Sequence, residues 1–190
     1  MSKVRALVVT GFGINCEEEM AAGMRLGGAD ADIVHLNSVL LGDCAIGAYH
    51  VLCFPGGFSF GDDLGAGKAL ANKMKYRRSS GGHRLFDQLV AFLDGGGYVI
   101  GICNGFQALV KMGLLPNTGG RFEQEVTLTA NDSGKFEDRW VHCAVNEGPA
   151  APFLGGLDTI PLPVRHGEGK LLFANEQIRD AVVSGALNGL

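Results

Sequence analysis

The sequence has no membrane-length apolar run, no long basic run and no paired-cysteine motif. Because a bilayer-spanning helix needs roughly 20 apolar residues, we expect no membrane partner. Net charge is −4 with scattered Lys and Arg, which argues against a nucleic-acid partner. The five cysteines form no C-x-x-C and no Cys/His metal spacing, so we expect neither disulfides nor a bound metal. Glu17–Glu19 follow the first apolar run too closely for a secretion signal, and a cytoplasmic protein is expected.

The composition is that of a folded enzyme-sized domain. Of 190 residues, 46% are apolar and 19% are charged, which excludes a disordered chain. This length suits one domain, and we expect residues 1–190 to form it. Glycine is abundant, at 30 residues, which predicts many tight turns and close backbone approaches.

Strand-like apolar runs alternate with helical patterns over the first 112 residues. We predict helices over 17–26, with Asn15 as its cap, and over 66–75, 85–93 and 108–112. The predicted strands are 4–9, 32–36, 51–54 and 98–100. This alternation predicts an α/β fold of the flavodoxin-like type, a mostly parallel sheet with helices on both faces.

The pattern changes after Pro116, in the C-terminal third of the chain. Short runs over 125–129, 140–145, 162–164 and 171–173 alternate or are broken by proline and glycine. They predict mixed or antiparallel strands added to the α/β core. The polar stretch 131–135 is expected to be an exposed hairpin loop.

The segment 101–107, GICNGFQ, joins a predicted strand to a predicted helix. A cysteine flanked by glycines two residues away on each side is the thiol form of the nucleophile elbow. The turn presents the sulfur over the first turn of a helix, whose N–H groups favour the thiolate. Cys103 is therefore a candidate nucleophile. The alternative, a buried structural cysteine, is preferred for Cys44, Cys53 and Cys143.

A glycine pair, Gly56-Gly57, follows the strand at 51–54 and should lie at the same carboxyl edge of the sheet as Cys103. Backbone N–H groups there, with the N–H of Asn104, could hold the oxyanion of a tetrahedral intermediate. The alternative is a simple turn. The other glycine cluster, Gly11-Phe12-Gly13, is predicted to be a tight turn, because Cys16 stands where a dinucleotide loop needs its third glycine.

These residues resemble the class I, or triad-type, glutamine amidotransferases. Within that class they are similar to the glutaminase subunits of phosphoribosylformylglycinamidine synthase, from purine biosynthesis. The segments that carry the resemblance are TGFGINCE (10–17), FPGGFSFGD (54–62), GICNGFQ (101–107), FEDRWV (136–141) and VRHGEGK (164–170).

The resemblance implies that Cys103 is the glutaminase nucleophile and that the N–H groups of Gly57 and Asn104 form the oxyanion hole. It also implies that Gly56, Phe106 and Gln107 bind substrate glutamine. The chain would need no cofactor of its own. It would pass ammonia to a synthetase large subunit that holds ATP and magnesium, with a small accessory subunit as a further candidate partner.

One part of the family pattern is missing. The triad's histidine and glutamate lie in a His-Pro-Glu segment near the C-terminus in the family, and this sequence contains no such segment. We therefore expect a chain that lacks its C-terminal part and is inactive alone. His166 and Glu168 are the weaker alternative, because the family's equivalent His-Gly-Glu-Gly segment is separate from the triad.

Two other functions stay open. One is a cysteine hydrolase or stress protein of the DJ-1/PfpI type, which would need an acidic residue on an early strand, and only Asp32 qualifies. The other is a non-catalytic subunit that only docks to a synthetase.

Overall fold

The computed structural model describes residues 3–61, 63–79, 81–145 and 152–184. Asp62, the last residue of the FPGGFSFGD segment, and the chain end at 185–190 lie outside them. The chain divides into two compact units, residues 1–109 and 110–190. Each unit is described by itself, and a single domain over 1–190 stays a prediction.

The first unit is built on a four-stranded parallel sheet, as predicted. The strand order is β2-β1-β3-β4, and every neighbouring pair is parallel. The strands are β1 (Arg5–Thr10), β2 (Asp30–His35), β3 (Val51–Phe54) and β4 (Tyr98–Gly101). Apart from Arg5, strands β1, β3 and β4 carry no charged residue. Strands β1 and β3 are largely buried, whereas Tyr98 and Ile100 of β4 are exposed.

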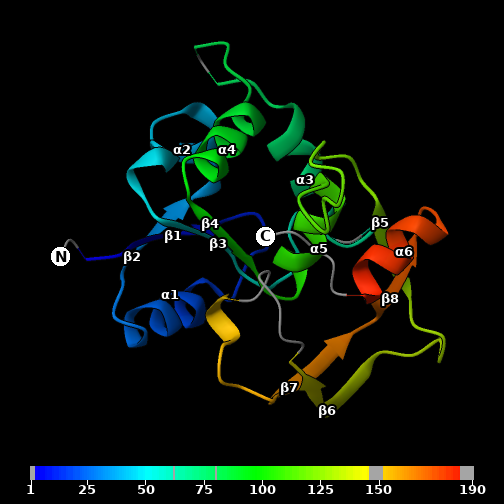
Figure 1. Ribbon diagram of the computed structural model, residues 1–190. Helices are drawn as coiled ribbons and strands as arrows, with labels where there is room; N and C mark the ends of the chain where they lie inside the picture. Colours follow the sequence, from blue (N-terminus) through cyan, green and yellow to red (C-terminus); the bar gives the residue numbers. More distant parts are fainter. Residues whose placement is uncertain (1–2, 62, 80, 146–151, 185–190) are drawn as a thin grey trace. The chain divides into compact units, whose positions relative to one another are not determined.

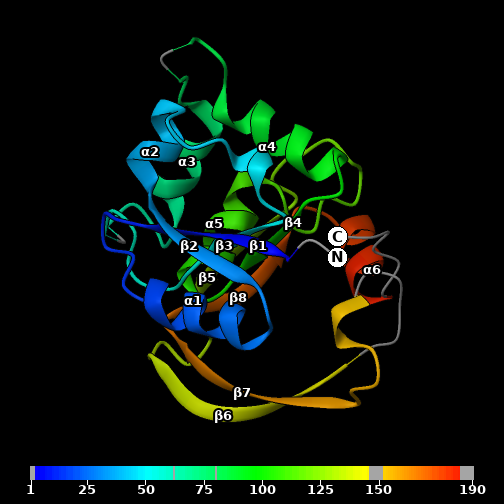
Figure 2. The ribbon, with the colours of Figure 1, turned by 90° about the vertical axis from the view of Figure 1, so that its left-hand side faces the viewer.

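Helices connect these strands. They are α1 (Glu17–Leu26), α2 (Leu36–Leu41), α3 (Lys68–Tyr76), α4 (Leu85–Asp94) and α5 (Asn104–Met112), with a short 3₁₀ turn η1 (Ile46–Ala48). Helix α1 lies on one face of the sheet and α2 and α4 lie on the other (Figures 1 and 2). On the α1 face, Met20 and Ala21 pack with Ala6, Val8 and Cys53. The prediction of helices on both faces is confirmed.

One helix was not predicted, and one predicted helix cap was wrong. Helix α2 was missed because its apolar residues follow β2 with no turn residue between them. His35 ends the strand and caps the helix, since its Nδ1 accepts from the Asn37 N–H at 3.1 Å. At α1 the N-cap is Cys16 rather than Asn15, and no side chain makes a capping bond. The Asn15 Oδ1 instead accepts from the Cys16 thiol at 3.2 Å.

The second unit contains two separate antiparallel strand pairs. Strand β5 (Val126–Ala130) pairs with β8 (Glu168–Phe173), and β6 (Glu137–Ala144) pairs with β7 (Thr159–His166). The pair β6–β7 forms a long curved ribbon, which Figure 2 shows in side view. The segment 131–135 therefore joins two strands that do not pair with each other, and the prediction of a hairpin there was wrong.

A small apolar core holds β5 and β8 of this unit together. Val110, Val126 and Leu128 are buried, and Leu171 and Ile178 pack against them. Helix α6 (Glu176–Val183) supplies Ile178, and a second 3₁₀ turn, η2 (Pro152–Leu154), precedes β7. Antiparallel strands in the C-terminal third are confirmed.

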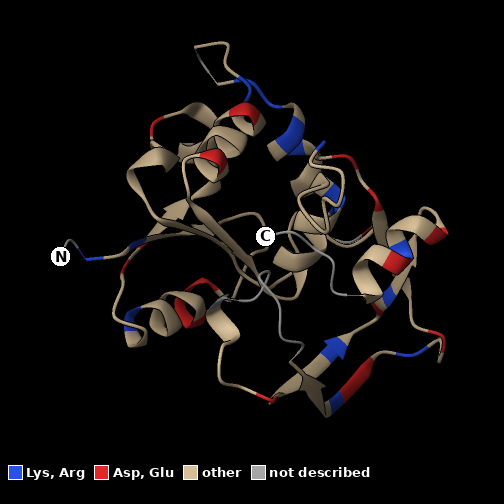
Figure 3. Cartoon of the chain, viewed as in Figure 1, with Lys and Arg blue, Asp and Glu red and all other residues tan. Residues whose placement is uncertain are grey.

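Charges of both signs are interspersed along the surface elements of both units (Figure 3). Cys53 is buried as predicted, and its burial raises the pKa of its thiol to about 12. Cys143 is exposed and Cys44 is only half-buried, so the prediction that both are core was wrong. Among the residues described, no helix combines the length and apolar character needed to cross a membrane.

The junction of β4 and α5 is formed by unusually close backbone approaches. A Cβ added to Gly105 would overlap the carbonyl oxygen of Phe54, at the end of β3. A Cβ added to Gly101 would lie 2.6 Å from Leu109 Cδ1 and 2.8 Å from the Phe106 nitrogen. Only glycine lets helix α5 start this close to the sheet.

This packing predicts opposite effects for two Gly→Ala substitutions. Gly105→Ala should lower the free energy of unfolding by about 3 kcal/mol or more, because backbone atoms must move to admit the methyl group. Gly23→Ala, on α1 with no atom within 4 Å of the added carbon, should raise it by up to about 1 kcal/mol. Urea unfolding of the two variants tests this, and equal stability would contradict the packing described.

Candidate active site

Cys103 lies at the turn between β4 and α5, and its side chain is exposed. Its φ angle is +54°, in the left-handed region that a residue with a Cβ seldom adopts. The turn is held by the Ile102 N–H, which donates to the Phe54 carbonyl at 3.1 Å, and by the Gly105 N–H, which donates to the Ile102 carbonyl at 3.0 Å. These features are those of a nucleophile elbow, so the predicted presentation of Cys103 is confirmed.

The loop after β3 runs directly beside this cysteine. A Cβ built on Gly56 would lie 3.3 Å from the Cys103 Cβ and 3.5 Å from the Cys16 sulfur. The structure thus brings Gly56 and Cys103 together at the carboxyl edge of the sheet, as the sequence predicted. It also brings Cys16 to the same place, which the sequence analysis did not predict.

A short bridge to the loop after β1 fixes the conformation of Gly57. Ile14 and Gly57 face each other in an antiparallel bridge whose two bonds run from Phe58 N–H to the Gly13 carbonyl, 2.8 Å, and from Asn15 N–H to the Gly56 carbonyl, 3.2 Å. Gly57 has φ +138°, and a Cβ there would lie 2.5 Å from the Gly13 oxygen. Only glycine fits this position.

The bridge does not use the Gly57 N–H. In an antiparallel pair of this kind the N–H groups of the two facing residues point away from the partner strand. Asn104 is the first residue of α5, where backbone N–H groups have no partner within the helix. Among the hydrogen bonds of the described residues, none assigns an acceptor to either N–H.

The loop that contains Gly11 and Gly13 is a tight turn, as predicted. The Ile14 N–H donates to the Gly11 carbonyl at 3.1 Å. Phe12 stacks on Phe60, with ring centroids 4.6 Å apart, which places this turn against the loop after β3. The turn supports that loop through its backbone.

A buried polar cluster joins the loop after β3 to helix α5. Ser59 is fully buried, Asn104 is 1% exposed and Gln107 is 9% exposed. The Asn104 Oδ1 accepts from the Ser59 hydroxyl at 2.6 Å and from the Ser59 N–H at 3.1 Å, and the Asn104 Nδ2 donates to Gln107 Oε1 at 3.3 Å. Phe106, on the first turn of α5, is 38% exposed.

The sequence analysis did not predict that Cys16 and its neighbour Glu17 would belong to this region. Burial raises the pKa of the Cys16 thiol, and the nearby Glu19, Cys103 and Glu17 raise it further. Glu17 accepts from the Thr10 hydroxyl at 2.8 Å through one carboxylate oxygen, and its other oxygen is buried with no hydrogen-bond partner among the described residues. The one feature of the sequence that pointed to this segment was the resemblance of residues 10–17 to the corresponding segment of the class I glutamine amidotransferases.

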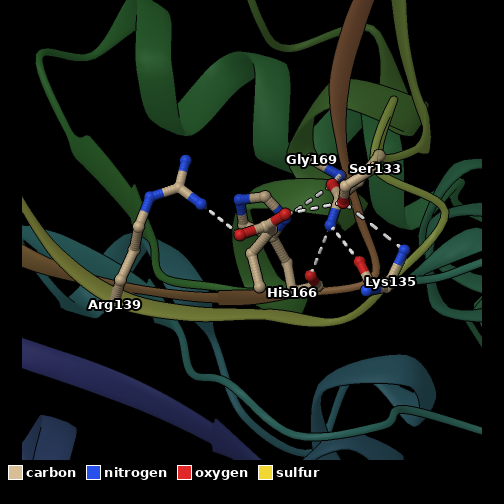
Figure 4. A network of polar contacts seen from close by, with 7 residues as sticks. Ser133, Lys135, Arg139, His166 and Gly169 are labelled. Carbon is tan, nitrogen blue, oxygen red and sulfur yellow. Dashed lines mark hydrogen bonds and ion pairs between the residues drawn. The ribbon is translucent and has the colours of Figure 1, made fainter.

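His166 lies at the end of β7, in the second unit, within a network of polar side chains from β6 and the loop before it (Figure 4). Its Nδ1 is 2.9 Å from Asn131 Oδ1, and the same oxygen accepts from the Gly169 N–H at 3.0 Å. The Asn131 side-chain amide donates to the His166 carbonyl at 2.8 Å. A Cβ on Gly169 would overlap the imidazole ring, so the ring lies against this backbone.

Glu168, the first residue of β8, contacts a different part of the second unit from His166. Its carboxylate is 3.8 Å from the Lys111 ammonium, whose side chain is 10% exposed.

The site geometry predicts an order of thiol reactivity. Exposed Cys103 should react with iodoacetamide faster than Cys16 at pH 8, and Cys53 should not react in the folded protein, because it is buried and its pKa is about 12. Cys16 should react slowly, and its rate should still be rising above pH 9, since a raised pKa delays formation of the thiolate. Mass spectrometry of tryptic peptides measures each site, and faster labelling of Cys16 than of Cys103 would contradict this geometry.

Comparison with known proteins identifies the family to which the chain belongs. Residues 3–188 match the family model described as the CobB/CobQ-like glutamine amidotransferase domain. A phosphoribosylformylglycinamidine synthase subunit PurQ from Dehalococcoides mccartyi is 44% identical over 178 residues, which cover 94% of this chain and 67% of the relative. A protein of the same name from Methanococcus maripaludis is 44% identical over 168 residues, covering 87% of this chain and 58% of the relative.

Among solved structures, PurLQS from Thermotoga maritima contains a chain that matches with a TM-score of 0.69 and 28% identity, over 92% of this chain and 72% of that one. The chain thus spans between about three-fifths and three-quarters of the length of these relatives. The matched family model, together with an exposed cysteine in an elbow beside a glycine pair, shows that the chain belongs to the glutamine amidotransferases, in the family of the PurQ subunits.

Proposed function

We propose that this chain carries the glutamine-hydrolysing site of a phosphoribosylformylglycinamidine synthase. The observation that supports the proposal is the exposed, left-handed Cys103, which lies against Gly56 at the end of the loop that contains Gly57 and directly precedes Asn104. The N–H groups of Gly57 and Asn104 are the proposed oxyanion donors. A nucleophile next to paired N–H donors is the arrangement that acyl transfer requires. Gly56, Phe106 and Gln107 surround the elbow and are proposed to bind glutamine.

In the proposed reaction the Cys103 sulfur forms a bond to the side-chain amide carbon of glutamine. The carbonyl oxygen becomes an oxyanion, which the N–H groups of Gly57 and Asn104 stabilise. The C–N bond then breaks, and the nitrogen leaves as ammonia with a proton that the thiol supplied. Water hydrolyses the resulting thioester, which releases glutamate and restores the thiol.

The ammonia is proposed to pass to a synthetase subunit in purine biosynthesis. The support is the name of the relatives and the match to a chain of PurLQS. The large synthetase subunit is the proposed site of ATP and magnesium, and a small accessory subunit is a further proposed partner. A cytoplasmic location is proposed from the same relationship.

We propose a supporting role for His166 and Glu168. The contact of His166 with Asn131 holds the end of β7 to the loop after β5, and the contact of Glu168 with Lys111 holds the start of β8 to α5. The 190 residues contain no His-Pro-Glu segment, so no acid–base pair is assigned to Cys103 within them. We therefore expect residues 1–190 alone to hydrolyse glutamine very slowly, because the residues of such a triad act as a unit.

The DJ-1/PfpI-type hydrolase is the weaker alternative. Asp32, its candidate acid, accepts from Arg5 Nη2 at 3.1 Å and from the Tyr49 hydroxyl at 3.0 Å. Arg5 begins β1, at the opposite end of the parallel sheet from the Cys103 turn. A non-catalytic docking subunit is the other alternative, and the next experiment separates it from an amidotransferase.

The first test of the proposal uses the chain together with its synthetase partner. Cys103→Ala should abolish glutamine-dependent synthesis and preserve synthesis from added ammonia, because only the hydrolysis of glutamine needs the thiol. Cys143→Ala, which removes another exposed cysteine, is the matched control and should change neither activity. Full glutamine-dependent synthesis by the Cys103→Ala complex would establish a docking subunit instead.

The second test concerns His166. His166→Ala should lower the free energy of unfolding by about 1 kcal/mol, through loss of its hydrogen bond to Asn131. It should leave the rate at which a diazo-ketone analogue of glutamine labels Cys103 within about twofold of the original chain, because a structural role confined to the second unit does not alter the elbow. A hundredfold fall in that rate, with the fold intact, would assign His166 to the catalytic machinery.

A further inference from the structure

The two proposed oxyanion donors come from segments far apart in the sequence. Gly57 is in the loop after β3, and Asn104 begins α5. Stabilisation of an oxyanion requires both N–H groups to lie about 3 Å from one point in space. Some contact must therefore fix the loop after β3 against the start of the helix.

Ser59 and Asn104 make such a contact, across 45 residues of sequence. Ser59 lies two residues after Gly57, and both its hydroxyl and its N–H donate to the Asn104 Oδ1, at 2.6 and 3.1 Å. Both residues are at most 1% exposed. Paired donors on one acceptor, out of water, hold the two backbones more firmly than a single exposed bond would.

The same bonds orient the Asn104 side chain. Because its oxygen takes both Ser59 donors, its NH₂ group is directed to Gln107, whose Oε1 accepts at 3.3 Å. The cluster therefore extends from the loop that presents one oxyanion donor to a residue proposed to bind glutamine.

We infer that Ser59 is a positioning residue of the glutaminase site, acting through the Asn104 side chain to hold the Gly57 and Asn104 N–H groups in register with Cys103. The inference rests on the proposed glutamine hydrolysis. Ser59 contacts no reacting atom in this account, and the Asn104 side chain has a role distinct from that of its backbone N–H. A displacement of about 1 Å in such a donor can reduce a rate about a hundredfold.

The experiment measures the labelling rate of Cys103 by two reagents and takes their ratio. The diazo-ketone analogue of glutamine (diazo-oxo-norleucine) depends on the substrate and oxyanion contacts, whereas iodoacetamide needs only an accessible thiol. Ser59→Ala should lower the ratio of analogue to iodoacetamide labelling by about 10- to 100-fold. Ser38→Ala, which removes a half-buried hydroxyl on α2, is the matched control and should leave the ratio unchanged.

The double variant Ser59→Ala/Asn104→Leu separates positioning from stability. A single substitution leaves a buried polar group without its partner, whereas apolar replacement of both partners can restore stability. The Asn104 backbone N–H is retained in this variant. We expect thermal stability to recover toward that of the original chain and the labelling ratio to stay as low as in Ser59→Ala. Recovery of the ratio together with stability would show a merely structural role and overturn the inference.

The remaining outcomes are also decisive. An unchanged ratio in Ser59→Ala, with the original chain still preferring the glutamine analogue, would overturn the positioning role and leave the proposed function intact. Failure of both variants to fold would assign the pair to stability alone and overturn the inference. Absence of any preference in the original chain would overturn the proposed glutamine site itself, and the inference with it.

Discussion

The site depends on one close contact, between the backbone of helix α5 at Gly105 and the carbonyl of Phe54 at the end of β3. No side chain fits between them, so the helix begins almost on the edge of the sheet. The chain between β4 and α5 must then turn within two residues, and Cys103 takes the left-handed conformation that this turn demands. The strain is maintained by the packing around it and leaves the sulfur exposed at the carboxyl edge.

Parallel strand order explains why three distant segments meet at this edge. Strands β1, β3 and β4 lie next to one another, so the loops that follow them emerge side by side. The loop after β1 braces the loop after β3 through the Ile14–Gly57 bridge, and the loop after β3 is tied to α5 through Ser59 and Asn104. Each segment therefore constrains the next, and the cysteine lies where they join.

Much of this could be predicted from the sequence, because the decisive signals are local. Glycines at 101 and 105 indicate a close backbone approach, and the apolar run 51–54, which is short and stopped by Pro55, indicates a buried strand. The pairing of β5 with β8 could not be predicted, since strand partners are chosen by contacts between residues far apart in the chain. The same holds for Cys16, whose position beside Gly56 follows from the fold rather than from its neighbours in sequence.

The most direct test is a crystal structure of the chain after reaction with the diazo-ketone analogue of glutamine. The account predicts a covalent bond to the Cys103 sulfur, with the analogue's carbonyl oxygen about 3 Å from the N–H groups of both Gly57 and Asn104. An adduct on another cysteine, or one on Cys103 whose oxygen points away from these two groups, would contradict it.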